Sequence, residues 1–470
     1  MKRLRAAATS LLVILTVALC LRLGYGWDYQ QHRAHRALGV IPFLFEPGNI
    51  AASVATGKGF SSPFRVETGP TAWLTPVYPL LLAGIFRLFG LYTFQSFVAA
   101  AVLNILFSTC TCVPIYYAGR RIGGRGVAAG AAWLWAVFPN AIRLPVESMW
   151  DASLAALLAA IILWATLALG ESNRRVLSRA VSATEPDEDP RSDGHATSVA
   201  FVRVLRERGW PPRVRAGQTA VTGRGLSGVS DWCAYGLLWG LALMTNPTLL
   251  SLLPFLLGWL AYRTSPWSER YGHAALAAGM VMLCCAPWTV RNYVVFHRFI
   301  PLRSVVGLTL WLGNHDQSTG AWVGRLHPIT NAEERAKYIE LGEIAYMQDK
   351  QQEAVQFMME HPWDELRACW FRFVVIWTGG SAHPLAEFGG VLLFNVLMSI
   401  GALAGIVVLF RVGSPYAFPL AVFPIVFPCA YYLTLASARY RHPMDPVLML
   451  LAAIAVGQLA RLRPIVNRPT

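Results

Sequence analysis

Long apolar runs recur along this 470-residue chain, and they constrain its fold more than any other feature. A helix of about 20 apolar residues is long enough to cross the hydrocarbon layer of a membrane. The composition agrees, because 55% of the residues are hydrophobic and only 14% are charged, against about 25% charged residues in ordinary soluble domains. We therefore predict an all-α polytopic membrane protein.

The apolar runs and the arginines at their ends predict about ten transmembrane helices, with both termini in the cytoplasm. A signal peptide is the alternative for the first run, but no small-residue cleavage site follows it, so we expect an uncleaved span. The run 76–90 is too short to cross and contains Arg87, which predicts an interfacial or re-entrant helix. The predicted spans are residues 6–21, 94–117, 126–138, 152–169, 232–243, 248–262, 274–288, 388–410, 416–435 and 446–459.

The spans and loops divide the chain into five predicted regions. Residues 171–230 are rich in arginine and lack apolar periodicity, which predicts a disordered cytoplasmic insertion. Within it, residues 199–208 fit a short basic amphipathic helix on anionic lipid, and a solvated linker is the alternative. The other regions are an N-terminal membrane core with the first outer loop, central helices, a large extracytoplasmic loop with amphipathic helices, and C-terminal helices: residues 1–170, 231–290, 291–387 and 388–470.

The charge and the cysteines exclude several classes of function. The formal net charge is +14, but no finger, helix-turn-helix or RNP-like pattern accompanies it, so we expect no nucleic-acid partner. The eight cysteines show no metal-ligand spacing, and no paired-carboxylate cage is evident. We therefore expect neither a required metal nor a cofactor.

Carboxylates in the predicted outer loops are the first candidates for chemistry. Glu46 precedes a short predicted helix that has Pro47 in its first turn and Gly57 just past its end. A carboxylate at this position either takes part in a reaction or complements the helix dipole. Glu147 and Asp151 lie in the next short outer loop, where helix capping is the alternative role.

Basic residues at the predicted outer face are the second set of candidates. Arg439, Arg441 and His442 lie in one short turn, and Arg291 lies at the outer end of another span. Positive charge is disfavoured on this side of a membrane, and the guanidinium fork suits phosphate. The turn therefore indicates an anionic ligand, with ordinary contact to lipid headgroups as the alternative.

Several short motifs follow one another in an order typical of one family. After Glu46 come Gly57-Lys-Gly, Thr68-Gly-Pro-Thr-Ala-Trp73, Pro76-Val-Tyr-Pro79, Phe86-Arg-Leu-Phe-Gly90, Asp151 and Arg439-Tyr-Arg-His-Pro443. In this respect the chain, apart from residues 171–230, resembles the GT-C membrane glycosyltransferases that use lipid-phosphate sugar donors. The nearest branch is glycosyltransferase family 39, with the protein mannosyltransferases and aminoarabinose transferases.

This resemblance implies a role for each candidate residue. Glu46 would be the general base, and Asp151, Glu147 and Tyr78 would orient the acceptor or the sugar. The basic residues Arg439, Arg441, His442 and Arg291 would bind the donor phosphate. Two positions depart from the family pattern: Glu46-Pro47 replaces an Asp-Glu pair, and Thr75 replaces a lysine.

The resemblance also implies partners and a location. The donor would be a polyprenyl-phosphate-linked sugar and the acceptor a glycan, lipid or protein. Transfer would invert the anomeric centre, at an extracytoplasmic site of a bacterial plasma-membrane protein. A lipid-linked oligosaccharide flippase or transporter is the main alternative, although the repeats and intramembrane charges typical of transporters are not evident. A membrane scaffold would leave the outer arginines unexplained.

Overall fold

The computed structural model describes residues 9–34, 43–184, 228–263, 267–316, 318, 324–379 and 389–466. Within these ranges the regular structure is helical, apart from one isolated antiparallel bridge between Ser61 and Pro70. The predicted all-α class is confirmed. The predicted insertion lies mostly outside the described residues, as does the amphipathic helix considered at 199–208. The first part of the predicted insertion, residues 171–184, differs from the expectation of disorder, because the helix that begins at Ala152 continues to Thr184.

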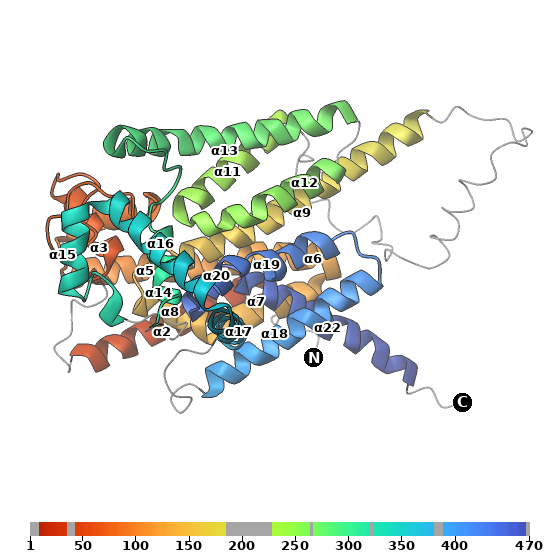
Figure 1. The fold of residues 1–470 in the computed structure, drawn as a ribbon. Coiled ribbons are helices and arrows are strands. Elements are labelled where there is room, and N and C mark those ends of the chain that lie inside the picture. Colours follow the sequence, from red (N-terminus) through yellow and green to blue (C-terminus); the bar gives the residue numbers. More distant parts are fainter. Residues whose placement is uncertain are drawn as a thin grey trace, which may run out of the picture.

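Long helices lie alongside one another and form a bundle (Figure 1). Small residues bring the last helices close together: a Cβ on Gly405 would lie 2.1 Å from the backbone oxygen of Leu451. Gly401 and Gly405 form the small-xxx-small spacing that favours close helix packing in membranes. The bundle helices are α2 (Leu11–Ala34), α4 (Val77–Phe89), α5 (Phe94–Cys110), α6 (Cys112–Gly123), α7 (Arg125–Ala136), α8 (Pro139–Glu147), α9 (Ala152–Thr184), α11 (Val229–Thr245), η2 (Pro247–Leu252), α12 (Leu253–Arg263), α13 (Trp267–Phe296), α18 (Gly389–Arg411), α19 (Ala417–Val426), α20 (Cys429–Leu433) and α22 (Asp445–Val466).

Five helices in the described ranges are long and apolar enough to cross a membrane, or six if the bent pair α7–α8 counts as one span. Each coincides with a predicted span: Leu11–His32, Phe94–Gly123, Ala152–Glu171, Tyr271–Phe296 and Gly390–Arg411.

The remaining predicted spans correspond to shorter or interrupted helices. For example, α11 ends at Thr245, and Asn246-Pro247 starts the 3₁₀ segment η2 before α12 continues. An apolar run reveals neither such a break nor the bend that divides α7 from α8. The run 76–90 forms the 13-residue helix α4, as short as expected.

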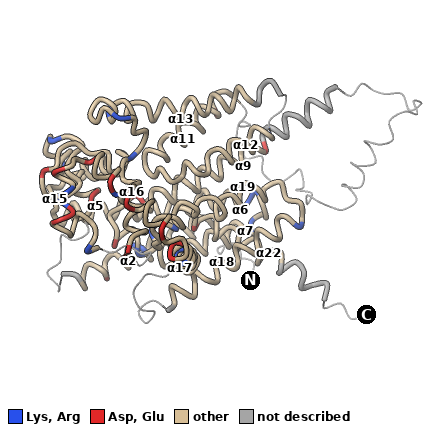
Figure 2. The backbone as a smooth tube through the Cα atoms, viewed as in Figure 1, with Lys and Arg blue, Asp and Glu red and all other residues tan. Residues whose placement is uncertain are grey.

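Shorter helices gather at one end of the bundle and form what we call the cap, at the left of Figure 1. Acidic residues are frequent there, whereas the middle of the bundle is almost free of charge (Figure 2). Helix α14 buries Leu308, Trp311 and Leu312 in the core of the cap. The cap elements are α3 (Glu46–Ala55), α14 (Val306–Gly313), η3 (Gly324–Leu326), α15 (Ala332–Leu341), α16 (Glu343–Glu360), α17 (Pro362–Thr378) and α21 (Ala438–Arg441).

Candidate active site

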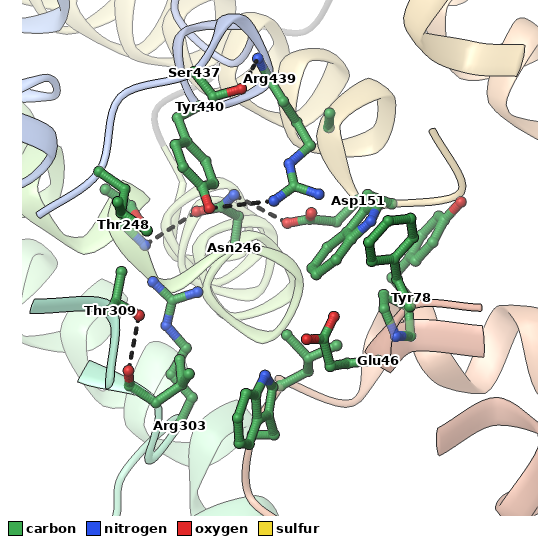
Figure 3. Close-up of a pocket in the computed structure, with 18 of the residues that line it drawn as sticks. Glu46, Tyr78, Asp151, Asn246, Thr248, Arg303, Thr309, Ser437, Arg439 and Tyr440 are labelled. Atoms are coloured by element: carbon green, nitrogen blue, oxygen red, sulfur yellow. Dashed lines mark hydrogen bonds between the residues drawn. The ribbon is translucent and has the colours of Figure 1, made fainter. Parts of the chain in front are cut away.

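A cavity of about 510 Å³ lies where the cap meets the ends of the bundle helices. Its polar walls come from segments far apart in sequence, and Figure 3 shows them facing one space. The polar and charged residues that line it are Glu46, Thr75, Tyr78, Glu147, Ser148, Asp151, Thr245, Asn246, Thr248, Arg303, Thr309, His327, Tyr431, Thr434, Ser437, Arg439 and Tyr440. Aromatic rings, including Trp73 and Trp150, complete the lining.

Glu46 lies at the first residue of α3 and is buried, with 4% of its surface exposed. The local sequence explains the placement, because Pro47 suits a first helical turn and Gly48 lets the backbone of Phe43 pass close to the helix. Burial raises the pKa of Glu46 to about 7, opposed by a backbone hydrogen bond and by the positive charge of Arg439. Its carboxyl group therefore changes its protonation state near neutral pH.

Asp151 lies directly before α9 and faces the same cavity. Its backbone oxygen accepts the N–H of Ala155 at 2.8 Å, while its side chain accepts a hydrogen bond from Asn246 Nδ2 at 2.9 Å. The Asp151 side chain is therefore directed into the cavity. Burial raises the pKa of Asp151, opposed first by Arg439 and then by Arg303.

Arg439 projects into the cavity from α21. Its guanidinium lies 3.9 Å from the ring centre of Trp150 and donates a hydrogen bond to the Tyr440 hydroxyl at 3.2 Å. In the described ranges, no carboxylate oxygen lies within 4 Å of the guanidinium nitrogens. The charge is positioned by aromatic rings and is not neutralised by a direct ion pair.

Arg303 is a second cavity arginine, which the sequence analysis missed. It precedes α14 in a segment fixed by its neighbour: Ser304 donates its hydroxyl to Glu343 at 2.6 Å and its N–H to Ala72 O at 2.9 Å. Figure 3 shows its guanidinium pointing into the cavity. Only its position in a predicted outer loop could have drawn attention to it, and other arginines share that property.

His327 is the other functional candidate that the sequence did not reveal. It follows η3, is 6% exposed, and its Nε2 atom lies 3.2 Å from Oε1 of Glu46. No motif surrounds it, and 281 positions separate the two residues in the printed sequence. Contact between them depends on the folding of the cap.

Tyr78 and Glu147 line the cavity, as the interpretation of their roles requires. Both are also bound on their far sides. The hydroxyl of Tyr78 exchanges hydrogen bonds with Asn104. Glu147 accepts two hydrogen bonds from Arg143, at 3.0 and 3.1 Å, and a third from Tyr25.

Arg441 and His442 do not line the cavity, contrary to the sequence-based expectation. Arg441 is fully buried, forms an ion pair with Asp445 at 2.6 Å and donates to the carbonyl oxygens of Ile376 and Trp377. His442 is stacked against Trp135 in the bundle. In a helical turn, residues two apart point to different sides, so Arg441 points away from the cavity that Arg439 faces.

Arg291 also lies outside the cavity lining. Its guanidinium donates to the carbonyl oxygens of Thr71 and Phe60, at 2.7 and 2.8 Å, and lies over the ring of Trp288. These contacts fasten the first outer loop to α13. The phosphate-binding role expected for Arg291 is therefore not supported by its position.

Comparison with known proteins identifies the fold. No family model matches the chain, and no curated protein matches its sequence. Among solved structures, it is similar to the oligosaccharyltransferase AglB of Archaeoglobus fulgidus in complex with an inhibitory peptide and a dolichol-phosphate, with a TM-score of 0.54 and 12% identity. The apo form of the same oligosaccharyltransferase gives a TM-score of 0.51 and 14% identity. The chain has the GT-C fold.

The two matches cover nearly all of this chain but only part of the oligosaccharyltransferase. Each covers 98% of this chain and 52% of the oligosaccharyltransferase, so the chain spans about half the length of those proteins. ArnT from Cupriavidus metallidurans bound to undecaprenyl phosphate is matched over 98% of this chain and 80% of its own, with 14% identity and a TM-score of 0.39. With its apolar helices and this fold, the chain is an integral membrane protein.

The cavity combines one carboxyl group that titrates near neutral pH with two arginines that have no direct carboxylate partner among the described residues. Such a set can accept a proton and bind an anion. Among the described residues, no group of three or more His, Cys, Asp or Glu side chains is arranged to hold a metal ion. We therefore assign no metal ligands.

Proposed function

We propose that the protein is a membrane glycosyltransferase that moves a sugar from a polyprenyl-phosphate donor to an extracytoplasmic acceptor, with inversion at the anomeric carbon. The observation that carries the proposal is that Glu46, Arg439 and Arg303 share one cavity. The GT-C fold supports it, since the AglB structure of the same fold contains a dolichol-phosphate. The cap would face outward, with both termini and the insertion in the cytoplasm.

Glu46 would act as the general base. The acceptor hydroxyl or amine attacks the anomeric carbon, its proton passes to the Glu46 carboxylate, and the bond from that carbon to the phosphate oxygen breaks. A single displacement with a single base inverts the anomeric centre. A pKa of about 7 suits this task, because the base is ionised near neutral pH and still holds a proton well.

Arg439 and Arg303 would bind the phosphate. A donor phosphodiester has one negative charge, and the departing polyprenyl monophosphate has two. Cations fixed where this charge develops stabilise the transition state more than the ground state. Arg303 would supply the second cation in a protein that has Thr75 where many members of the family it resembles have a lysine.

Asp151, Tyr78 and Glu147 would orient the sugar or the acceptor. Asp151 accepts a hydrogen bond from Asn246, and Figure 3 shows its carboxylate facing the cavity. Glu147 is already held by Arg143 and Tyr25, so its contribution would be to shape the wall near Asp151.

The test is sugar transfer by the purified protein in nanodiscs, supplied with radiolabelled polyprenyl-phosphate sugars and candidate acceptors. Glu46→Gln should lower the rate of transfer or donor hydrolysis by about 10²–10⁴-fold, and Arg439→Ala by about 10²–10³-fold. Glu67→Gln is the matched control, because Glu67 lies exposed in the same outer loop and pairs with Lys58. Full activity of Glu46→Gln would show that the assigned base is wrong.

The flippase alternative is tested with the same protein reconstituted into sealed vesicles in place of nanodiscs. Movement of intact labelled lipid between leaflets, without any cleavage of the sugar–phosphate bond by wild type, would favour a transporter. Cleavage that depends on Glu46 would favour the transferase.

A further inference from the structure

The contact between His327 and Glu46 is the most informative interaction in the cavity that the proposed reaction does not use. Nε2 of His327 lies 3.2 Å from Oε1 of Glu46, and both side chains are almost completely buried. A buried carboxylate without a hydrogen-bond donor is strongly disfavoured. The ring nitrogen nearest to this carboxylate belongs to His327, which directly follows η3.

The backbone determines which ring nitrogen of His327 carries the proton. The N–H of Ile329 donates a hydrogen bond to Nδ1 of His327 at 3.2 Å. A nitrogen that accepts a hydrogen bond carries no proton, so the proton of the neutral ring lies on Nε2. The separation of 3.2 Å between Nε2 of His327 and Oε1 of Glu46 is within hydrogen-bonding distance.

Aromatic neighbours keep the ring of His327 in place. Its centre lies 5.7 Å from Trp73 and 6.4 Å from Phe64, both in edge contacts, and Tyr338 packs against the same two rings. The turn itself is closed by hydrogen bonds from the N–H groups of Thr330 and Asn331 to the His327 carbonyl oxygen. These contacts hold the ring of His327 beside Glu46.

The other charged groups around Glu46 leave His327 as a neutral donor. Arg439 is the cation that acts most directly on Glu46, and Asp151 and Arg303 lie further along the same cavity. Burial lowers the pKa of His327 to about 3. The ring thus stays uncharged at every pH at which Glu46 titrates, and it is not a second base.

We propose that His327 is a positioning residue that donates its Nε2 proton to Glu46, and so holds this carboxylate ionised and correctly oriented for proton abstraction. The role in proton abstraction rests on the proposed function, but the hydrogen bond itself can be tested without a substrate. Donation favours the charged carboxylate over the protonated form, because a protonated carboxyl group accepts less strongly. Loss of the donor therefore raises the pKa of Glu46.

Two variants separate the donor from the ring. His327→Phe keeps an aromatic ring among Phe64 and Trp73 but cannot donate, whereas His327→Gln places an amide N–H near the position of Nε2 and has no ring. The titration of Glu46 is followed by pH-dependent infrared difference spectra of the carboxyl band, assigned by its loss in Glu46→Gln. His315→Phe is the control, since His315 is also a buried histidine against a tryptophan but does not line the cavity.

In His327→Phe the midpoint of the Glu46 titration should rise by about one to two pH units, the size expected for a hydrogen bond to a charged group. In His327→Gln and His315→Phe it should stay within about half a unit of wild type. The low-pH limb of kcat/KM for transfer should move in the same direction and by the same amount. An unchanged midpoint in His327→Phe, or an equal rise in His327→Gln, would overturn the proposal.

The two readouts distinguish this inference from the proposed function. A shifted infrared midpoint in a protein that transfers no sugar would refute the function and leave the hydrogen bond intact. An unshifted midpoint in a protein whose transfer still requires Glu46 would refute the role of His327 and leave the function intact.

Discussion

Arg439 and Arg441 stand two residues apart in one helical turn, yet they belong to regions that treat charge in opposite ways. Arg441 points into the bundle, where Asp445 and two backbone carbonyl oxygens bind it directly. Arg439 points into the cavity, where aromatic rings surround it and, in the described ranges, no carboxylate oxygen lies within 4 Å. Figure 3 shows that Arg303 faces the same space.

Two other buried cations of the described chain, Lys350 and Arg372, resemble Arg441, whereas the buried Arg22 donates to backbone carbonyl oxygens and to the hydroxyl of Ser108. Lys350 binds Glu334 at 3.3 Å within the cap, and Arg372 binds Glu365 at 3.3 Å and the carbonyl oxygen of Gly313. Matched charges of this kind hold elements together. Cations left without a direct partner reduce stability, and a ligand that supplies the missing negative charge gives a reason for them. The contrast separates structural charges from functional ones.

The largest expected effect concerns the structural side of this contrast. Arg441→Ala leaves Asp445 buried without its partner, so the free energy of unfolding should fall by about 3–5 kcal/mol. Thermal unfolding in detergent, followed by tryptophan fluorescence, measures the change. Arg439→Ala serves as the comparison, because it breaks no ion pair and should unfold close to the wild-type midpoint. Equal destabilisation of both variants would remove the distinction between the two regions.

The second prediction uses Glu46, whose burial is costly for folding. The pKa of Glu46 rises from its ordinary 4.5 to about 7 on folding, so between these pH values only the unfolded chain releases its proton. The free energy of unfolding therefore falls as pH rises toward 7 and changes no further above it.

Glu46→Gln removes this loss. Relative to wild type, the variant should gain up to about 3 kcal/mol at pH 8 and nothing at pH 4. Thermal midpoints of both proteins at the two pH values check it. A difference that does not depend on pH would mean that the carboxyl group titrates normally.

A smaller effect tests whether the guanidinium group of Arg303, and not only its positive charge, is required. Arg303→Ala should lower kcat/KM for sugar transfer by about 10- to 100-fold, the loss of one hydrogen-bonded charge. Arg303→Lys restores the charge but not the planar fork, and it should recover only part of this loss. Steady-state kinetics with the radiolabelled donor measure both. Full recovery by lysine would show that charge alone matters at this position.

Much of the membrane architecture could be predicted from the sequence, because a local property determines it. Apolar runs gave the all-α class, and the five helices that are long enough to cross lie where spans were expected. The break after Thr245 and the bend between α7 and α8 depend on local backbone geometry within apolar sequence, so hydropathy did not predict them.

The site was predictable only in part, because it forms by long-range packing. Glu46, Tyr78, Asp151 and Arg439 lie in recognisable motifs and Glu147 in a predicted outer loop, and all five line the cavity. Arg441 and His442 share the motif of Arg439, but helical geometry turns them into the bundle. Arg303 and His327 carry no motif of their own, and only the folded cap brings them to the cavity.

The most direct test of the contrast is the double variant Arg303→Ala/Arg439→Ala, studied for both folding and ligand binding. We expect its thermal midpoint in detergent to equal or exceed that of wild type, because two charges without ion-pair partners are removed. We also expect its binding of polyprenyl monophosphate, measured by native mass spectrometry, to be lost. A lower midpoint together with undiminished binding would contradict the account, since the two arginines would then stabilise the fold and not the ligand.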